Sequence, residues 1–194
     1  MTKSLWAVLI TALISACSGV GIPAADDPYA KLSQAEQLYS GPGRAAQARR
    51  LLNEAIATFQ EKGDDAGLAA AYRQYGFLAR LEGARDDVIF IRKSDPTTAP
   101  PQEDLDLSDN YFKRSVDLFL RTNRPDMASN VYYNLGVNSY FRGDRVQSCA
   151  YMDKALDASR QAEALQPGRP VDLPRGVRSF AEWISKAKAD AGCS

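Results

Sequence analysis

The chain of 194 residues contains no histidine, so it lacks the commonest general base near neutral pH and the commonest transition-metal ligand. Charge of one sign is not in excess either, because 24 basic residues balance 24 acidic ones. A balanced chain creates no long-range field that would attract polyanions. Composition therefore argues against nucleic-acid binding, and we expect neither a cofactor nor a metal ion.

Common enzyme signatures are also missing, since the sequence has no Walker-type phosphate loop and no nucleophile elbow. One acidic cluster precedes a predicted helix and offers oxygen ligands for calcium, but it lacks the turn glycine and final glutamate of an EF-hand loop. Acidic residues at a helix N-terminus need no metal, because they favour the helix dipole. The cluster consists of Glu103, Asp104, Asp106 and Asp109. We expect a non-enzymatic protein; the alternative is a cell-envelope enzyme or binding module for peptidoglycan or another saccharide.

Cysteines are few, and the first lies at the end of an apolar run. Residues 5–14 are too few to cross a bilayer, which takes about 20 apolar residues, and they suit a signal peptide. The run ends in Ile14-Ser15-Ala16-Cys17, which resembles a bacterial lipobox. The resemblance implies removal of residues 1–16, a diacylated Cys17 and, since Ser18 follows, an outer-membrane lipoprotein facing the periplasm. The alternative is ordinary signal-peptidase cleavage that leaves Cys17 as a plain thiol.

Two cysteines remain if Cys17 is acylated. Cys149 and Cys193 then form an even pair in an oxidising compartment, where a disulfide persists. The alternative is a buried small hydrophobe at 149 and a loose thiol at 193.

The chain resembles itself at a shift of 60 residues. Phe59 corresponds to Phe119, and the other identities fall at Tyr72 and Tyr132, Gly76 and Gly136, Gly83 and Gly143, and Arg85 and Arg145. Apolar residues recur every three or four positions between clusters of glycine, proline and aspartate, a pattern that predicts helices. Seven helices are expected, at 28–40, 44–62, 65–82, 105–122, 126–142, 144–164 and 177–191.

Small residues recur at matching positions of these helices. Gly76 and Gly136 stand in mid-helix, where glycine costs about 1 kcal/mol relative to alanine, so a neighbouring helix is expected to approach there. Pairs of small residues seven apart lie on one helical face, and they are Ala48 and Ala55, Ser108 and Ser115, and Ser148 and Ala155. This spacing predicts close crossing of paired helices.

The arrangement resembles tetratricopeptide repeats with a period of about forty residues. The match is best at residues 132–136, Gly143-Asp144 and residues 154–156, and it covers residues 28–164. It implies an all-α fold, a short solenoid of about three helical hairpins. An unrelated helical bundle with similar spacing is the alternative. Residues 17–27 form a tether, and residues 165–194 a connector and a capping helix.

Residues 84–104 form an insert in the middle unit. Its apolar Val88-Ile89-Phe90-Ile91 either tucks into the solenoid or offers an edge to a partner strand.

In the resembling family the first helices of successive pairs line a groove that binds peptides or proteins. Carried onto this chain, the groove residues are Arg73, Gln74, Phe77, Arg80, Asn130, Tyr133, Asn134, Val137 and Tyr140. The alternative for Tyr133, Tyr140 and Phe141 is packing between helices. The resemblance implies a scaffold or assembly factor that binds an envelope protein or a component of a secretion or assembly machine, in the manner of pilotins.

Overall fold

The computed structural model describes residues 26–41, 43–83, 100–168 and 176–193. In this part of the chain all regular structure is helical, which confirms the predicted all-α class. The helices are α1 (Pro28–Tyr39), α2 (Ala45–Lys62), α3 (Asp65–Gly83), α4 (Gln102–Arg121), α5 (Pro125–Phe141), α6 (Arg145–Leu165) and α7 (Phe180–Asp190). The predicted leader, Cys17, most of the tether and residues 84–99 of the insert lie outside the described residues.

Two helices begin three residues away from the predicted position, and the other five begin within one residue of it. Helix α4 begins at Gln102, directly after Pro101, with Glu103 and Asp104 in its first turn, so the insert is shorter than expected. Helix α7 begins at Phe180 rather than at 177, because the side chain of Ser179 accepts a hydrogen bond from the amide of Glu182. Such a cap fixes the first turn of a helix, whatever the apolar pattern before it.

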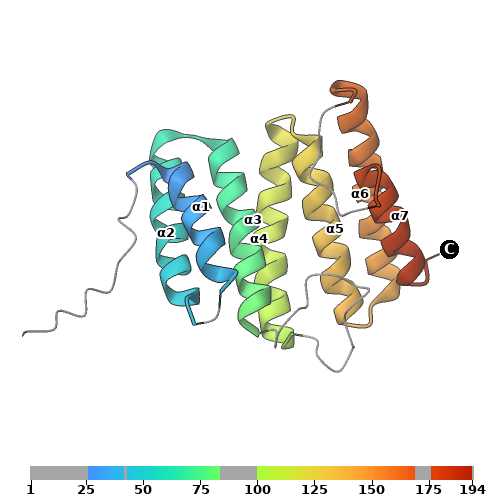
Figure 1. Cartoon of the computed structure of the whole chain (residues 1–194), viewed down its shortest axis with the longest axis horizontal. Helices are drawn as coiled ribbons and strands as arrows, with labels where there is room; N and C mark the ends of the chain where they lie inside the picture. The colour runs from blue at the N-terminus through green and yellow to red at the C-terminus, as the bar shows by residue number, and fades with distance from the viewer. Residues whose placement is uncertain (1–25, 42, 84–99, 169–175, 194) are drawn as a thin grey trace, which may run out of the picture.

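Consecutive helices pack against each other, and the row runs from the pair α1 and α2 at one end to α7 at the other (Figure 1). Packing is most extensive within the pairs α1 and α2, α3 and α4, and α5 and α6. Beyond its chain neighbours, α1 also packs against α3. Each helix thus packs mainly against its neighbours along the chain.

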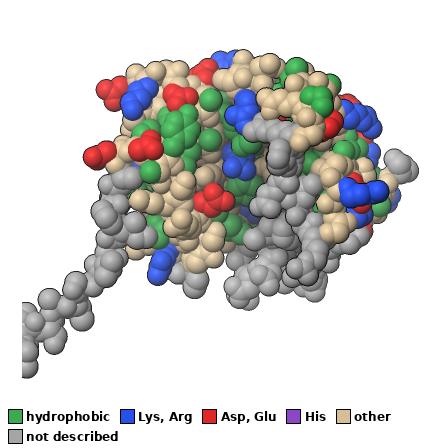
Figure 2. Space-filling view, turned by 45° about the horizontal axis from the view of Figure 1, so that its top comes forward, with side chains coloured by type: hydrophobic (Ala, Val, Ile, Leu, Met, Phe, Trp, Pro, Cys, Tyr) green, Lys and Arg blue, Asp and Glu red, His purple; other side chains and the backbone are tan. Residues whose placement is uncertain are grey.

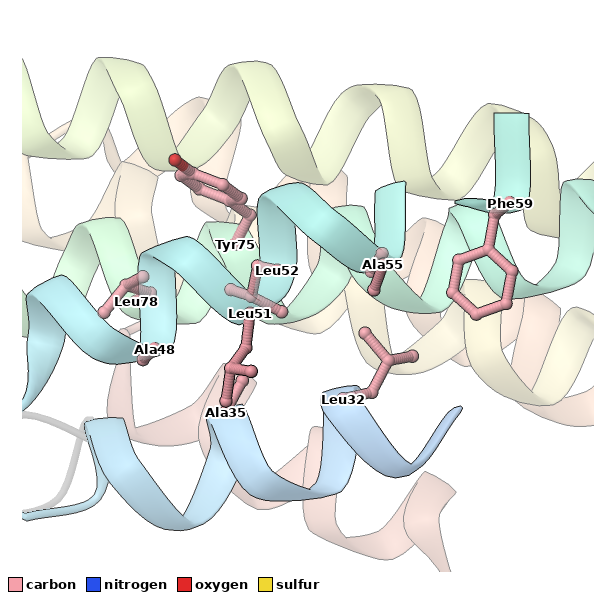
Figure 3. Packing of buried hydrophobic residues seen from close by; sticks show 10 residues of the cluster. Leu32, Ala35, Ala48, Leu51, Leu52, Ala55, Phe59, Tyr75 and Leu78 are labelled. Atoms are coloured by element: carbon pink, nitrogen blue, oxygen red, sulfur yellow. The ribbon is translucent and has the colours of Figure 1, made fainter. Parts of the chain in front are cut away.

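Three clusters of buried residues follow one another along the molecule. The first is shared by α1, α2 and α3 and includes Leu52 and Phe59, which have no exposed surface (Figure 3). The second joins α3, α4 and α5 around Phe112 and Leu135. The third joins α5, α6 and α7. Because each cluster spans three consecutive helices, each helix pair buries part of its apolar surface against a neighbouring helix.

The small residues at matching positions are all fully buried. Relative exposure is 0% at Ala48, Ala55, Ser108, Ser115, Ser148 and Ala155. Between α3 and α4, Ser115 Oγ donates a hydrogen bond of 2.8 Å to the carbonyl of Ala69. Between α5 and α6 the donor lies on the other helix, and Ser129 Oγ donates at 2.7 Å to the carbonyl of Ala155. The α3–α4 pair and the α5–α6 pair therefore make the same contact at matching positions, but the serine lies on the second helix in one pair and on the first helix in the other.

The two mid-helix glycines face the second helix of their own pair. A Cβ atom at Gly76 would lie 2.7 Å from the ring of Phe112 on α4. A Cβ atom at Gly136 would lie 3.0 Å from Cγ of Met152 and 3.2 Å from the carbonyl oxygen of Ser148 on α6. The close approach predicted from the sequence is present at both positions.

We expect Gly136→Leu to lower the free energy of unfolding by about 1–3 kcal/mol, because the larger side chain overpacks the contact between α5 and α6. The backbone of Ser148 cannot move aside as a flexible side chain can. Thermal melts measure the change, and Ala57→Leu at an exposed position of α2 is the matched control. Equal melting temperatures for the two variants would contradict the close approach of α6 to Gly136.

Helix α7 closes the end of the row. It buries Ile184 and Ala187 against α5 and α6, and Phe180 lies edge-on to Tyr133, with ring centroids 6.1 Å apart. A disulfide joins Cys149 in the second turn of α6 to Cys193, just beyond α7. The structure thus links the two cysteines that the sequence pairs.

No helix in the described ranges is long and apolar enough to cross a bilayer.

Candidate functional site

Arginine and asparagine side chains connect α3 to α5, the first helices of two successive pairs. Arg80 donates hydrogen bonds to the side-chain oxygens of Asn134, at 2.7 Å, and Asn138, at 3.1 Å. Two turns earlier, Arg73 donates to Asn130 at 3.3 Å. We call these five residues the Arg–Asn ladder. Its spacing follows from the sequence, because residues three, four or seven apart share a helix face.

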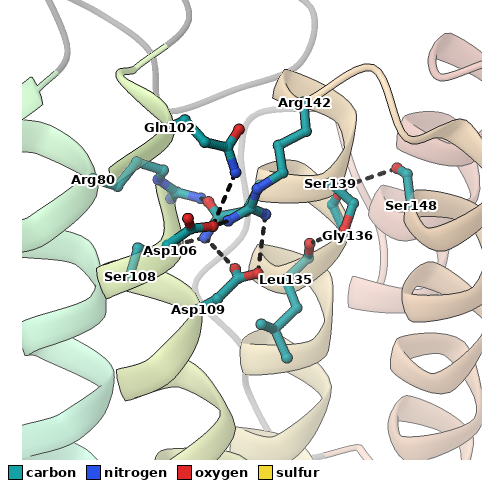
Figure 4. Close-up of polar contacts among 11 residues, drawn as sticks. Arg80, Gln102, Asp106, Ser108, Asp109, Leu135, Gly136, Ser139, Arg142 and Ser148 are labelled. Carbon is teal, nitrogen blue, oxygen red and sulfur yellow. Dashed lines mark hydrogen bonds and ion pairs between the residues drawn. The ribbon is translucent and has the colours of Figure 1, made fainter. Parts of the chain in front are cut away.

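The ladder continues into α4 through a network of charged side chains (Figure 4). Asn138 Nδ2 donates to Asp109 at 2.7 Å and to Ser108 Oγ at 2.9 Å. Arg142 donates to both Asp109 and Asp106, each at 2.9 Å. This network fixes α5 against α3 and α4 together.

Arg80 is a buried cation, with a relative exposure of 1%. Within the described residues its hydrogen-bond acceptors are amide oxygens, and Asn138 links it to Asp109. Burial lowers the pKa of the guanidinium to about 10, while nearby Tyr133, Asp109 and Tyr39 act in the opposite direction. The rings of Phe77 and Phe112 lie 5.5 Å and 5.8 Å from the guanidinium carbon, which adds a cation–π contribution.

Three buried polar atoms of α3 have no hydrogen-bond partner in the described part of the chain. They are Nε of Arg73, Nε of Arg80 and Oε1 of Gln74. Buried polar atoms are nearly always paired, so unpaired atoms on one helix are unusual. The polar surface of α3 is therefore only partly satisfied by α5.

The predicted groove residues divide into two groups. Five are buried, with relative exposures of 5% or less: Gln74, Arg80, Tyr133, Asn134 and Val137. The expectation that these five line an open groove is wrong. Tyr133 and Val137 pack in the third cluster against α7, and Arg80 and Asn134 bond to each other.

The other four predicted residues, Arg73, Phe77, Asn130 and Tyr140, are half-buried. Tyr39 of α1 is also half-buried, and the pKa of its phenol is raised by burial first and by Glu36 second, with Arg73 and Arg80 opposing. We call four side chains the α1–α3–α5 face: Tyr39, Arg73, Phe77 and Asn130. Tyr140 packs instead against the third cluster, as Tyr133 does. Figure 2 shows basic side chains set among hydrophobic ones near the middle of the visible surface.

The acidic cluster lies in the first turns of α4, and part of it forms ion pairs with an arginine. Asp106 and Asp109 both pair with Arg142, and no group of three histidine, cysteine, aspartate or glutamate side chains suited to a metal occurs within the described ranges. Two of the four carboxylates are thus accounted for by ion pairs with Arg142, which follows α5 directly.

The shifted carboxyl pKa values in the described segments all move downward. A hydrogen bond from Lys31 lowers the pKa of Glu54, and one from Tyr29 lowers that of Asp64. A hydrogen bond from Lys186 is the main cause of the drop to about 2 at Glu182. A general acid needs a raised pKa, so these carboxyls are poor candidates for glycoside hydrolysis.

Asn138, Asp109 and Arg142 were missed as members of the site. Asn138 lies one turn after Asn134 and two after Asn130, so the row of asparagines on α5 was a readable signal. The pairing of Asp109 with Arg142 had no such signal, because the two residues are 33 positions apart.

No protein-family model matches the chain, and neither a curated protein nor a solved structure shows significant similarity to it.

Proposed function

We propose that this chain is a non-enzymatic scaffold of tetratricopeptide-like repeats that binds a protein partner through its α1–α3–α5 face. The observation that carries the proposal is the repetition of the same contacts in successive helix pairs. The glycine contacts, the serine–carbonyl bonds and the fully buried small residues recur at matching positions.

A second repeated contact supports the same reading. Tyr72 of α3 meets Tyr111 and Arg114 of α4, with the guanidinium carbon 3.9 Å from the Tyr72 ring. In the next pair the corresponding residues are Tyr132, Tyr151 and Lys154, with the ammonium 5.8 Å and 5.5 Å from the two rings. Repeat proteins are built from such units, each contacting its neighbours.

The chemistry of the α1–α3–α5 face suits a protein partner. Tyrosine and arginine are enriched among residues that dominate binding energy, and asparagine supplies adaptable hydrogen bonds. Arg73 holds Asn130 through a single bond of 3.3 Å, so both side chains remain available for exchange with a ligand. The Arg–Asn ladder beneath keeps the two helices at a fixed distance.

The location is part of the proposal. The lipobox-like sequence at Cys17 supports a diacyl anchor, and Ser18 favours the periplasmic face of the outer membrane. At least two acyl chains are needed for stable attachment. The partner is then an envelope protein or a component of a secretion or assembly machine, and the comparison with pilotins rests on analogy of fold.

The test is crosslinking in the native cell followed by purification of the full chain. We expect one envelope protein to co-purify, and Arg73→Glu to reduce its yield at least fivefold, since losing a dominant contact costs over about 1 kcal/mol. Lys113→Glu, a charge reversal at an exposed position of α4, is the matched control and should bind normally.

Thermal melts of both variants check that the fold is kept. If Arg73→Glu melts lower, Arg73→Met replaces it, because methionine places no carboxylate near Glu36 at a site where burial already lowers the pKa of the arginine. Cys17→Ser in the same cells should leave the membrane fraction. A partner retained equally by Arg73→Glu and Lys113→Glu would remove the proposed face, and retention of purified peptidoglycan instead of a protein would favour the alternative function.

A further inference from the structure

A pocket of about 1000 Å³ lies at the α7 end of the molecule, away from the α1–α3–α5 face. Its walls come from the first turn of α5, the last two turns of α6 and the start of α7. This volume is at the upper end of the range for ligand pockets. Neither the Arg–Asn ladder nor the disulfide belongs to it.

The pocket exists because α7 is too short to cover α6. Helix α7 has 11 residues and α6 has 21, so ten residues of α6, about 15 Å of helix, extend beyond it. Helix α7 is fixed at the beginning of α6 by the disulfide and by a hydrogen bond from Lys188 to Asp153. Among the described residues, the part of α6 that α7 leaves uncovered is therefore its C-terminal half.

The floor of the pocket is apolar and its rim is charged. Pro125 is buried, Ala162 and Phe180 are half-buried, and Leu165 is 52% exposed, one of the few large apolar side chains that is exposed in the described segments. On the rim, Arg160 pairs with Asp157 and Arg178 with Glu182, and both arginines are more than two-thirds exposed. An apolar floor inside a charged rim that contains arginine is the usual anatomy of a protein–protein interface.

We propose that this pocket is a second docking site, which receives a short amphipathic helix of a protein partner as a continuation of α7. The floor continues the interface that α7 already makes with α5 and α6. The uncovered 15 Å matches a helix of about ten residues. A helix with apolar residues three and four apart would cover it, as Ile184 and Ala187 of α7 and the following Ala191 do on the adjacent surface.

The ends of the helices favour one direction for the occupant. Helix α7 runs antiparallel to α6, since Cys193 meets Cys149 near the beginning of α6. An occupant in line with α7 and parallel to it would place its C-terminal carbonyls near the N-terminus of α7, so that opposite dipole ends face each other. Acidic residues on its outer face would lie beside Arg160 and Arg178, whose exposed ion pairs contribute little and can exchange.

The experiment places a photoreactive phenylalanine analogue at position 165 of the full-length chain in its native cell. We expect crosslinking to a single protein, with the crosslinked peptide mapping by mass spectrometry to an amphipathic helical segment. Ala162→Trp, which fills the floor, should reduce this product at least tenfold. Ala57→Trp, at an exposed position of α2, is the matched control and should leave it unchanged.

Three outcomes would overturn the proposal: products that contain only lipid, products within residues 169–175 of the same chain, or a yield that Ala162→Trp does not change. The same photoreactive residue at Val146, which is 84% exposed and outside the pocket, sets the background. The inference does not require binding at the α1–α3–α5 face, so Arg73→Glu should leave the crosslinked product at position 165 unchanged.

Discussion

Replacing both cysteines, as Cys149→Ser with Cys193→Ser, is expected to lower the free energy of unfolding by about 4 kcal/mol. The bond closes a loop with a sequence separation of 44 residues, and the chain-entropy model assigns this amount to such a loop. For a protein of this size the melting temperature should fall by roughly 8–16 °C.

Thermal melts with and without a thiol reductant measure the effect. The reductant should lower the melting temperature of the unmodified protein and leave that of the double serine variant unchanged. The variant thus controls for effects of the reductant other than breaking the disulfide. Amide hydrogen exchange should show the largest loss of protection in α7, because α7 is short and is otherwise attached only by noncovalent contacts, such as those of Ile184, Ala187 and Lys188 with α5 and α6. An unmodified protein that melts alike in both buffers would show that the bond does not stabilise the fold.

Replacing Arg80 by methionine should destabilise the protein by about 2–4 kcal/mol. Methionine keeps much of the apolar volume, but it leaves the side-chain oxygens of Asn134 and Asn138 without the donors that Arg80 supplies. Each unsatisfied buried acceptor costs about 1–3 kcal/mol, and loss of the desolvated charge offsets part of this.

Arg73→Met is the matched control on the same helix. Arg73 is half-buried and makes one longer bond, so its loss should cost less than about 1 kcal/mol. Chemical denaturation gives both values. A variant Arg80→Met as stable as the original protein would mean that burying the cation costs as much as the ladder contributes.

The helix positions could be predicted because they depend on local patterns. Apolar spacing and the glycine and proline breakers predict all seven helices. The earlier start of α4, directly after Pro101, and the later start of α7, at the Ser179 cap, are set by local features that apolar periodicity does not report. The burial of small residues could also be predicted, since glycine at 76 and 136 is unfavourable in a helix unless a neighbour approaches.

The groove could not be predicted at the level of single residues. Sequence spacing places Tyr133 and Val137 on one face of α5, but it does not reveal that α7 returns to cover that face. Arg80 likewise reads as a surface cation, and its burial follows only from the approach of α5 and α4. The spacing of residues along a helix indicates on which face of that helix a side chain lies. Whether this face is buried depends on segments that are distant in sequence.

The disulfide also changes how the chain responds to mechanical load. A force applied between Pro28 and Cys193 passes through the sulfur atoms, so it bypasses α7 and the part of α6 that follows Cys149. The loop between the cysteines, roughly 150 Å of extended chain for a separation of 44 residues, is withheld from the extension while the bond is intact. Under force, α1 to α5 would therefore unfold and lengthen the chain, whereas the segment between the two cysteines could not lengthen while the disulfide is intact.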